Sequence, residues 1–128
     1  FAAYIRKVLG DEPIIYVVEP SNAPCLQRSI EYGRLMKANG PTSKMGRLDC
    51  KIPSLKAFYS LSKTANSFIT ITERESELGT RYLASQGYSI SQSGSAGLVA
   101  LSLLCQKKQS EMNYSSRVLC IFSEGDIK

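Results

Sequence analysis

The sequence predicts an α/β domain in which helices cover both faces of a parallel sheet, giving three layers. Short β-branched runs alternate along the chain with longer segments of helical periodicity. Two runs, Ile14–Val18 and Val118–Phe122, are apolar at almost every position, as in strands that are buried on both faces of a parallel sheet. The segment Ser93–Cys105 reads as a nearly all-apolar helix, which requires burial against such a sheet.

The first part of the chain predicts a helix, a strand and a second helix. Phe1–Leu9 has the character of the later part of a helix that ends at Gly10, which suggests that the chain is a fragment. The strand Ile14–Val18 follows Pro13. A helix then begins near Asn22 and Pro24, and its apolar positions are Leu26, Ile30 and Leu35.

The middle of the chain predicts a loop, a helix, a strand and a further helix. Met36–Ile52 shows no sustained periodicity and is expected to be a loop, after which a helix begins at Pro53. Ser67–Thr72 alternates and is β-branched, as in a strand. Thr72 and Glu75 have the spacing of a capping box for the next helix, which is expected to stop at Gly87.

Composition favours one compact domain over residues 1–128, since 43% of the residues are hydrophobic and 21% are charged. The net charge is +5, but the basic residues are scattered and no nucleic-acid-binding motif accompanies them. The longest apolar run, Ala96–Cys105, is about half of a membrane span, and no signal peptide is apparent. We therefore expect a cytoplasmic protein that binds neither membranes nor nucleic acid.

The sequence contains no histidine, and its four cysteines form no CxxC pair. A structural zinc site and Ser-His or Cys-His catalysis are therefore not expected. Folding could bring Cys25 and Cys50 together, so a disulfide and two free thiols both remain open. Cys105 and Cys120 are expected in the core.

Parallel sheets bind ligands at the carboxyl ends of their strands, and three polar stretches are expected there. They are Tyr16–Pro20 (YVVEP), Ser43–Ser54 (SKMGRLDCKIPS) and Ser91–Leu98 (SQSGSAGL). Their order and spacing, together with Arg117–Gly125 (RVLCIFSEG), resemble the C-terminal half of fold-type II pyridoxal-phosphate (PLP) enzymes. Within that group, MGRLDCK followed by Pro-Ser is most similar to the diaminopropionate ammonia-lyase branch.

The resemblance implies that the chain is part of the large PLP-binding domain of such an enzyme. It would be the C-terminal fragment of a PLP-dependent ammonia-lyase that acts on diaminopropionate or a similar amino acid. In the family, the Ser of an SG-x-x-G turn donates to the pyridine nitrogen of PLP, and Ser93 and Gly94 match that turn. A hydroxyl is a neutral partner, so it leaves the pyridine unprotonated. The alternative for Ser93 is that it only caps the apolar helix.

Other residues are weaker candidates for the site. The resemblance places the loop of Gly46 near the PLP ring, where a glycine lets the backbone approach, although an ordinary loop glycine is the alternative. Leu48 and Asp49 beside it are candidates for lining the site. Glu19 either contacts the site indirectly or serves as a carboxylate at a helix start.

The resemblance also implies that essential parts lie outside this chain. The lysine that holds PLP as a Schiff base belongs to an upstream motif, and the phosphate loop should precede Phe1. The stretch Thr42–Arg47 only imitates the lysine motif, so we interpret Lys44 as a solvated charge and assign no catalytic residue. Ile52 and Gln92 stand where the family motif has carboxylates. We therefore expect the chain to be inactive alone.

An incomplete sheet should expose apolar surface and a strand edge. We expect these to be covered by another copy, in a homo-oligomer, or by a complementary N-terminal fragment. A nonenzymatic α/β module that binds an anion or a partner protein at the strand ends is the alternative function.

Overall fold

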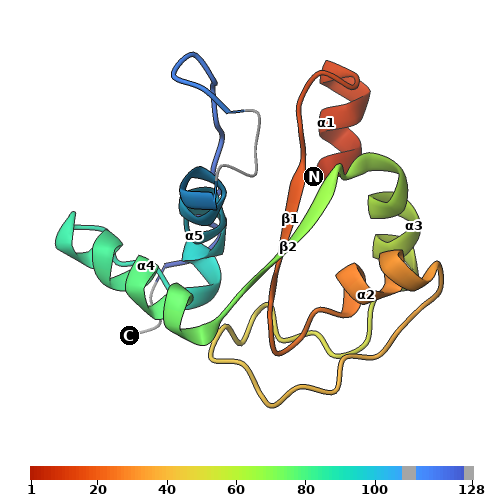
Figure 1. Cartoon of the computed structure of the whole chain (residues 1–128), viewed down its shortest axis with the longest axis horizontal. Coiled ribbons are helices and arrows are strands. Elements are labelled where there is room, and N and C mark those ends of the chain that lie inside the picture. Colours follow the sequence, from red (N-terminus) through yellow and green to blue (C-terminus); the bar gives the residue numbers. More distant parts are fainter. Residues whose placement is uncertain (108–111, 126–128) are drawn as a thin grey trace.

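The computed structural model describes residues 1–107 and 112–125, which form a two-stranded sheet and five helices. Helices α1, α2 and α3 lie on one side of the strands and α4 and α5 on the other (Figure 1). This arrangement confirms the predicted α/β class. In chain order the elements are α1 (Ala2–Leu9), β1 (Tyr16–Pro20), α2 (Cys25–Tyr32), α3 (Leu55–Thr64), β2 (Ser67–Ile71), α4 (Glu73–Ser85) and α5 (Gln92–Lys107).

The sheet consists of β1 and β2, which run parallel in a register that pairs Tyr16 with Ser67 and Pro20 with Ile71. Strand β1 begins two residues later than the predicted Ile14, because the pairing starts only where β2 starts. Before that point, the Ile15 carbonyl accepts hydrogen bonds from the backbone N–H groups of Asn66 (2.9 Å), which precedes β2, and of Ser67 (3.3 Å), its first residue.

The prediction of a third strand at Val118–Phe122 is wrong. Outside β1 and β2, the described residues contain only an isolated antiparallel bridge, between Ile90 and Gly125. Leu119 is 76% exposed, although the segment has the composition of a buried strand. Composition is not sufficient, because a strand exists only where a neighbour accepts its backbone hydrogen bonds.

Two further predictions about the chain's interior are wrong. Cys105 is exposed and Cys120 is only partly buried, so they do not lie in the core. Helix α2 ends at Gly33, whose left-handed φ of 65° a glycine adopts without strain. Leu35 therefore lies beyond the helix, where it is 44% exposed.

The core forms where the loop between α2 and α3 meets β2 and α5. It contains Ile71 of β2, three residues of α5 and Met45 of the loop, which is fully buried; the three α5 residues are Ala96, Val99 and Ala100. A loop that supplies a core residue is tied to the rest of the domain by apolar burial. Within the described residues, no helix has both the length and the apolar character needed to cross a bilayer.

Helix α4 starts with the predicted capping box. The Thr72 hydroxyl accepts a hydrogen bond from the Glu75 backbone N–H, and the Glu75 carboxylate accepts one from the Thr72 backbone N–H at 2.7 Å. Each group satisfies an N–H that has no partner within the helix. The box therefore determines where α4 begins, directly after β2.

We expect Thr72→Ala to lower the free energy of unfolding by about 1 kcal/mol, because the first turn of α4 loses its cap. Urea denaturation followed by circular dichroism measures the change. Thr42→Ala, at an exposed loop position, should shift the midpoint far less. Equal effects of the two substitutions would contradict the role of the cap.

Candidate functional site

A pocket of about 320 Å³ lies between the loop that follows α2 and the start of α5. It brings together two of the stretches that the sequence places at the strand ends. Gly46 and Ser93, which were predicted from separate motifs, both line it. The lining residues are Lys44, Gly46, Arg47, Ser91, Gln92, Ser93 and Glu124.

Ser93 bridges the two walls of this pocket. Its side chain is buried, and its Oγ accepts a hydrogen bond from the Arg47 backbone N–H at 3.2 Å. The hydroxyl that caps α5 belongs to Ser91, which accepts from the Gly94 N–H at 2.9 Å. Capping therefore does not explain Ser93. Since a hydroxyl both accepts and donates, Ser93 keeps a proton that it can donate to a ligand acceptor.

The two predicted glycines have different surroundings. A Cβ on Gly46 would meet no atom within 4 Å, so the loop is open to the pocket at this point. A Cβ on Gly94 would collide with the Glu124 carbonyl oxygen and lie 2.9 Å from Ile90 Cγ2. Gly94 does not line the pocket. Position 94 requires a glycine because the C-terminal segment approaches α5 closely there.

Arg47 and Glu124 close one side of the pocket and were not singled out from the sequence. Arg47 Nε lies 3.2 Å from Glu124 Oε2, and the Ser91 hydroxyl donates to Glu124 Oε1 at 2.7 Å. The Arg47 side chain is 69% exposed, so this ion pair contributes little to stability. The sequence did contain a signal for them, because Arg47 lies within the motif Ser43–Ser54 and Glu124 within Arg117–Gly125.

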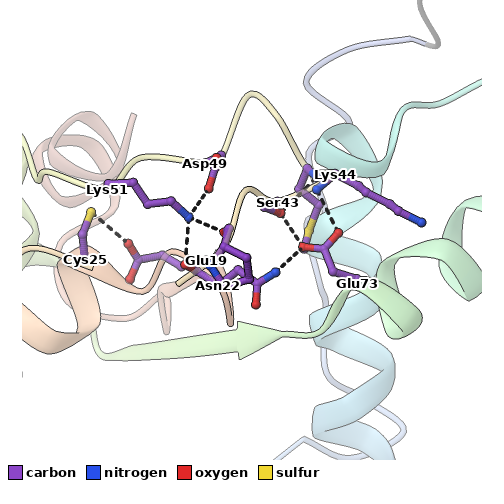
Figure 2. A network of polar contacts seen from close by, with 10 residues as sticks. Glu19, Asn22, Cys25, Ser43, Lys44, Asp49, Lys51 and Glu73 are labelled. Atoms are coloured by element: carbon purple, nitrogen blue, oxygen red, sulfur yellow. Dashed lines mark hydrogen bonds and ion pairs between the residues drawn. The ribbon is translucent and has the colours of Figure 1, made fainter. Parts of the chain in front are cut away.

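Glu73, the first residue of α4, holds the start of the pocket loop (Figure 2). Its carboxylate accepts hydrogen bonds from the Ser43 hydroxyl at 2.6 Å, the Lys44 backbone N–H at 2.9 Å and the Asn22 side-chain amide at 3.3 Å. A carboxylate is also favoured electrostatically at a helix N-terminus. Glu73 therefore connects the ends of both strands to the loop that carries Gly46.

Lys51 holds the far end of the same loop (Figure 2). Its ammonium lies 2.6 Å from Asp49 Oδ1 and donates to the carbonyls of Pro41 (2.7 Å) and Asn22 (2.9 Å). The hydrogen bond from Lys51 holds the pKa of Asp49 below its usual range. Asp49 is thus paired with Lys51, and Leu48 packs against the core. Neither residue lines the pocket, so the prediction that they line the site is wrong.

Glu19 serves as the carboxylate at the start of α2. It is buried and accepts hydrogen bonds from the backbone N–H groups of Leu26 (2.9 Å) and Gln27 (2.7 Å). The Cys25 thiol lies 3.6 Å from the same carboxylate. Burial, with Glu19 nearby, raises the pKa of Cys25 to about 11, and both Cys25 and Cys50 are free thiols. The possible disulfide is therefore absent.

Comparisons with known proteins concern the family and the fold of the chain. The family model described as "pyridoxal-phosphate dependent enzyme" matches residues 1–124. No curated protein sequence matches the chain. The solved structure of diaminopropionate ammonia lyase from Escherichia coli superposes with a TM-score of 0.77 at 24% identity, covering 95% of this chain and 34% of that one.

Two other solved structures share the fold. Maize serine racemase gives a TM-score of 0.75 at 17% identity, covering 85% of this chain and 33% of that chain. A threonine deaminase from T.th. gives a TM-score of 0.74 at 20% identity, covering 82% of this chain and 39% of that chain. The chain therefore spans between about a third and two fifths of the length of these three structures.

We expect Glu73→Gln to loosen the pocket loop, because the Ser43 hydroxyl and the Lys44 N–H donate to different oxygens of the carboxylate and an amide replaces one of these oxygens with an NH2 donor. The loss should be about 2 kcal/mol, typical for hydrogen bonds to a charged group. Hydrogen exchange of residues 43–48 measures it. Glu77→Gln is the matched control, since Glu77 only pairs with Arg81 on the exposed face of α4. Unchanged exchange in Glu73→Gln would contradict the anchoring role.

We expect the hold of Lys51 on Asp49 to depend on pH. The folded pKa of Asp49 is depressed, so its stabilising contribution is present above the unfolded value and is lost as pH falls through the folded one. Carboxyl NMR titration should show Asp49 titrating below an unfolded-chain aspartate. In Lys51→Met the Asp49 pKa should rise toward the ordinary value. The same titration midpoint in both proteins would exclude Lys51 as the cause.

Proposed function

We propose, because the chain belongs to the pyridoxal-phosphate dependent enzyme family, that it forms one wall of a PLP site in an amino-acid ammonia-lyase. The observation that carries the proposal is the meeting of Ser93 and the Gly46 loop in one pocket at the strand ends. In α/β sheets, this edge is where ligands bind.

The residues present fit the ring side of the cofactor. Ser93 is buried beside the pocket, and its acceptor side is occupied by the Arg47 N–H. Its proton is thus suited to a neutral ring nitrogen. At Gly46 there is open space where any other residue would place a Cβ, so a flat ring could approach the loop backbone.

The chemistry of the proposal divides between the cofactor and the chain. PLP, when bound, supplies an electron sink for bonds at the α-carbon of an amino acid. Ser93 would orient the ring by donating to its nitrogen, and the loop of Gly46 would exclude water from one side. Neither residue transfers a proton from the substrate, so we assign this chain no catalytic residue.

The substrate we propose is 2,3-diaminopropionate or a similar amino acid. Three observations support it: the MGRLDCK motif, the TM-score of 0.77 with the ammonia lyase of Escherichia coli, and the charged rim. Lys44 on the rim would attract a substrate carboxylate, whereas the charges of Arg47 and Glu124 already pair with each other. Deamination of threonine or serine uses substrates of the same class.

The experiment that tests the proposal is a PLP absorbance titration of the chain and of Ser93→Ala, each mixed with a complementary N-terminal half, because this chain supplies only one wall of the site. We expect reversible binding that Ser93→Ala weakens about tenfold, the equivalent of one hydrogen bond of about 1.4 kcal/mol. Borohydride reduction followed by intact-mass analysis should leave no adduct on this chain, because the proposal assigns Lys44 no covalent role.

Ser123→Ala is the comparison variant, since Ser123 is a second hydroxyl next to a pocket residue, Glu124. A loss of affinity confined to Ser123→Ala would assign the ring contact to that hydroxyl and contradict the role of Ser93. A reduced adduct at Lys44 would overturn the assignment of that lysine. Complete indifference of the mixture with the N-terminal half to PLP would favour the nonenzymatic binding module instead.

A further inference from the structure

The pocket holds two charges that the proposed function does not use, those of Arg47 and Glu124. Both residues line it, and Arg47 Nε lies 3.2 Å from Glu124 Oε2. Among the described residues of the lining, Glu124 is the only one with a carboxylate and Lys44 is the only other cation. The charge that a ligand meets in the pocket therefore depends on whether Glu124 is paired.

The Glu124 carboxylate is held at the pocket by contacts other than its ion pair. The Ser91 hydroxyl donates to its Oε1 at 2.7 Å, and the side chain is only 24% exposed. The backbone beside it is docked at the start of α5, since Gly125 forms a bridge with Ile90. Glu124 Oε2 would therefore stay at the pocket if its cationic partner were removed.

Arg47 is the partner that can be changed without disturbing the loop. Its side chain is 69% exposed, whereas its backbone N–H donates to the Ser93 hydroxyl at 3.2 Å. A substitution at this position removes the guanidinium and keeps the backbone donor to Ser93. With Ser91 on one oxygen of Glu124 and Arg47 beside the other, the carboxylate is occupied and the pair adds no net charge to the pocket.

We propose that Arg47 determines the charge of the ring that this pocket accepts, by neutralising Glu124. A free carboxylate near a pyridine nitrogen stabilises the protonated, cationic ring, as an aspartate does in other PLP sites. A paired carboxylate does not, because the guanidinium cancels its field and Lys44 adds a further positive charge. The neutral ring is then favoured, with the Ser93 hydroxyl as its donor.

The inference rests on the proposed function and names a residue that tunes its chemistry. A neutral ring withdraws electrons less strongly than a cationic one. Elimination from the β-carbon needs less withdrawal, because the leaving group takes up the electrons. Arg47 is thus a specificity-determining residue and not a catalytic one, since it acts on the ring through Glu124.

Two small probes test the pocket without PLP: pyridine, which is uncharged at neutral pH, and N-methylpyridinium, a similar ring with a fixed positive charge. NMR titration of the full chain measures both affinities, and the amide shifts of residues 44–47 and 91–93 locate the probes. We expect the unaltered chain to prefer pyridine. Arg47→Met should shift the preference toward N-methylpyridinium about fivefold, the equivalent of about 1 kcal/mol for a partly exposed ion pair.

Arg81→Met is the matched control, because Arg81 pairs with Glu77 on the exposed face of α4 and does not line the pocket. Its preference should equal that of the unaltered chain. Arg47→Lys retains a cation and should keep most of the preference for pyridine. Adding Glu124→Gln to Arg47→Met removes the freed carboxylate, so N-methylpyridinium should lose what it gained.

An unchanged preference in Arg47→Met, or an equal shift in Arg81→Met, would overturn the proposal. Binding of neither probe to any variant would overturn it too. A shift that appears only when Lys44→Met is combined with Arg47→Met would show that Lys44 also neutralises Glu124, and would contradict the role given to Arg47 alone.

The same variants extend the test to the cofactor. In the mixture with an N-terminal half, NMR of ring-labelled PLP should show a higher pKa of the ring nitrogen with Arg47→Met, because a free carboxylate favours the protonated form. PLP that binds with the same nitrogen pKa in both proteins would contradict this inference alone. PLP that fails to bind would contradict the proposed function, while the probe preference still decides the role of Arg47.

Discussion

The anchoring of one long loop by two charged side chains is the constraint on which the rest of this structure depends. Between α2 and α3 the chain runs from residue 34 to residue 54 without regular structure. Ordering such a stretch costs roughly 1–2 kcal/mol per residue in backbone entropy. Glu73 holds its first half and Lys51 its second, and each also contacts Asn22 after β1. Their hydrogen bonds satisfy loop groups that no helix or strand satisfies.

The pocket exists because that loop is anchored. With Met45 buried under it, the backbone at Arg47 is held against Ser93, and the ion pair between Arg47 and Glu124 brings the C-terminal segment to the same place. Three parts of the chain that are distant in sequence thereby form one site. The strongly held contacts lie behind the pocket, while its rim is exposed. This division suits a site that must be rigid at its base and accessible to a ligand.

The exposed apolar surface of the chain is a consequence of its small sheet. Helices cover both sides of the sheet (Figure 1), but only two strands are present among the described residues for them to cover. Tyr16 and Val18 of β1 and Val118 and Leu119 of the C-terminal segment consequently line an apolar groove of about 490 Å³. Parallel strands gain most of their stability from neighbours on both edges and helices on both faces. The groove therefore marks where the hydrogen bonding and burial of this sheet are incomplete.

The sequence by itself determined the local elements, because their signals are local. The capping box at Thr72 and the helix stop at Gly10 require only residues a few positions apart. It also indicated that the Gly46 and Ser93 motifs belong to one site. Only the tertiary structure decided which groups meet: Ser91 rather than Ser93 caps α5, Asp49 faces Lys51 rather than the pocket, and Val118–Phe122 forms no strand. The role of Ser93 and the missing strand depend on partners that are distant in the sequence, the Arg47 N–H and a neighbouring strand, and such contacts exist only when folding delivers the partner. The cap at Ser91 and the pair of Asp49 with Lys51 are local contacts, but only the folded loop decides that Asp49 turns to Lys51 and away from the pocket.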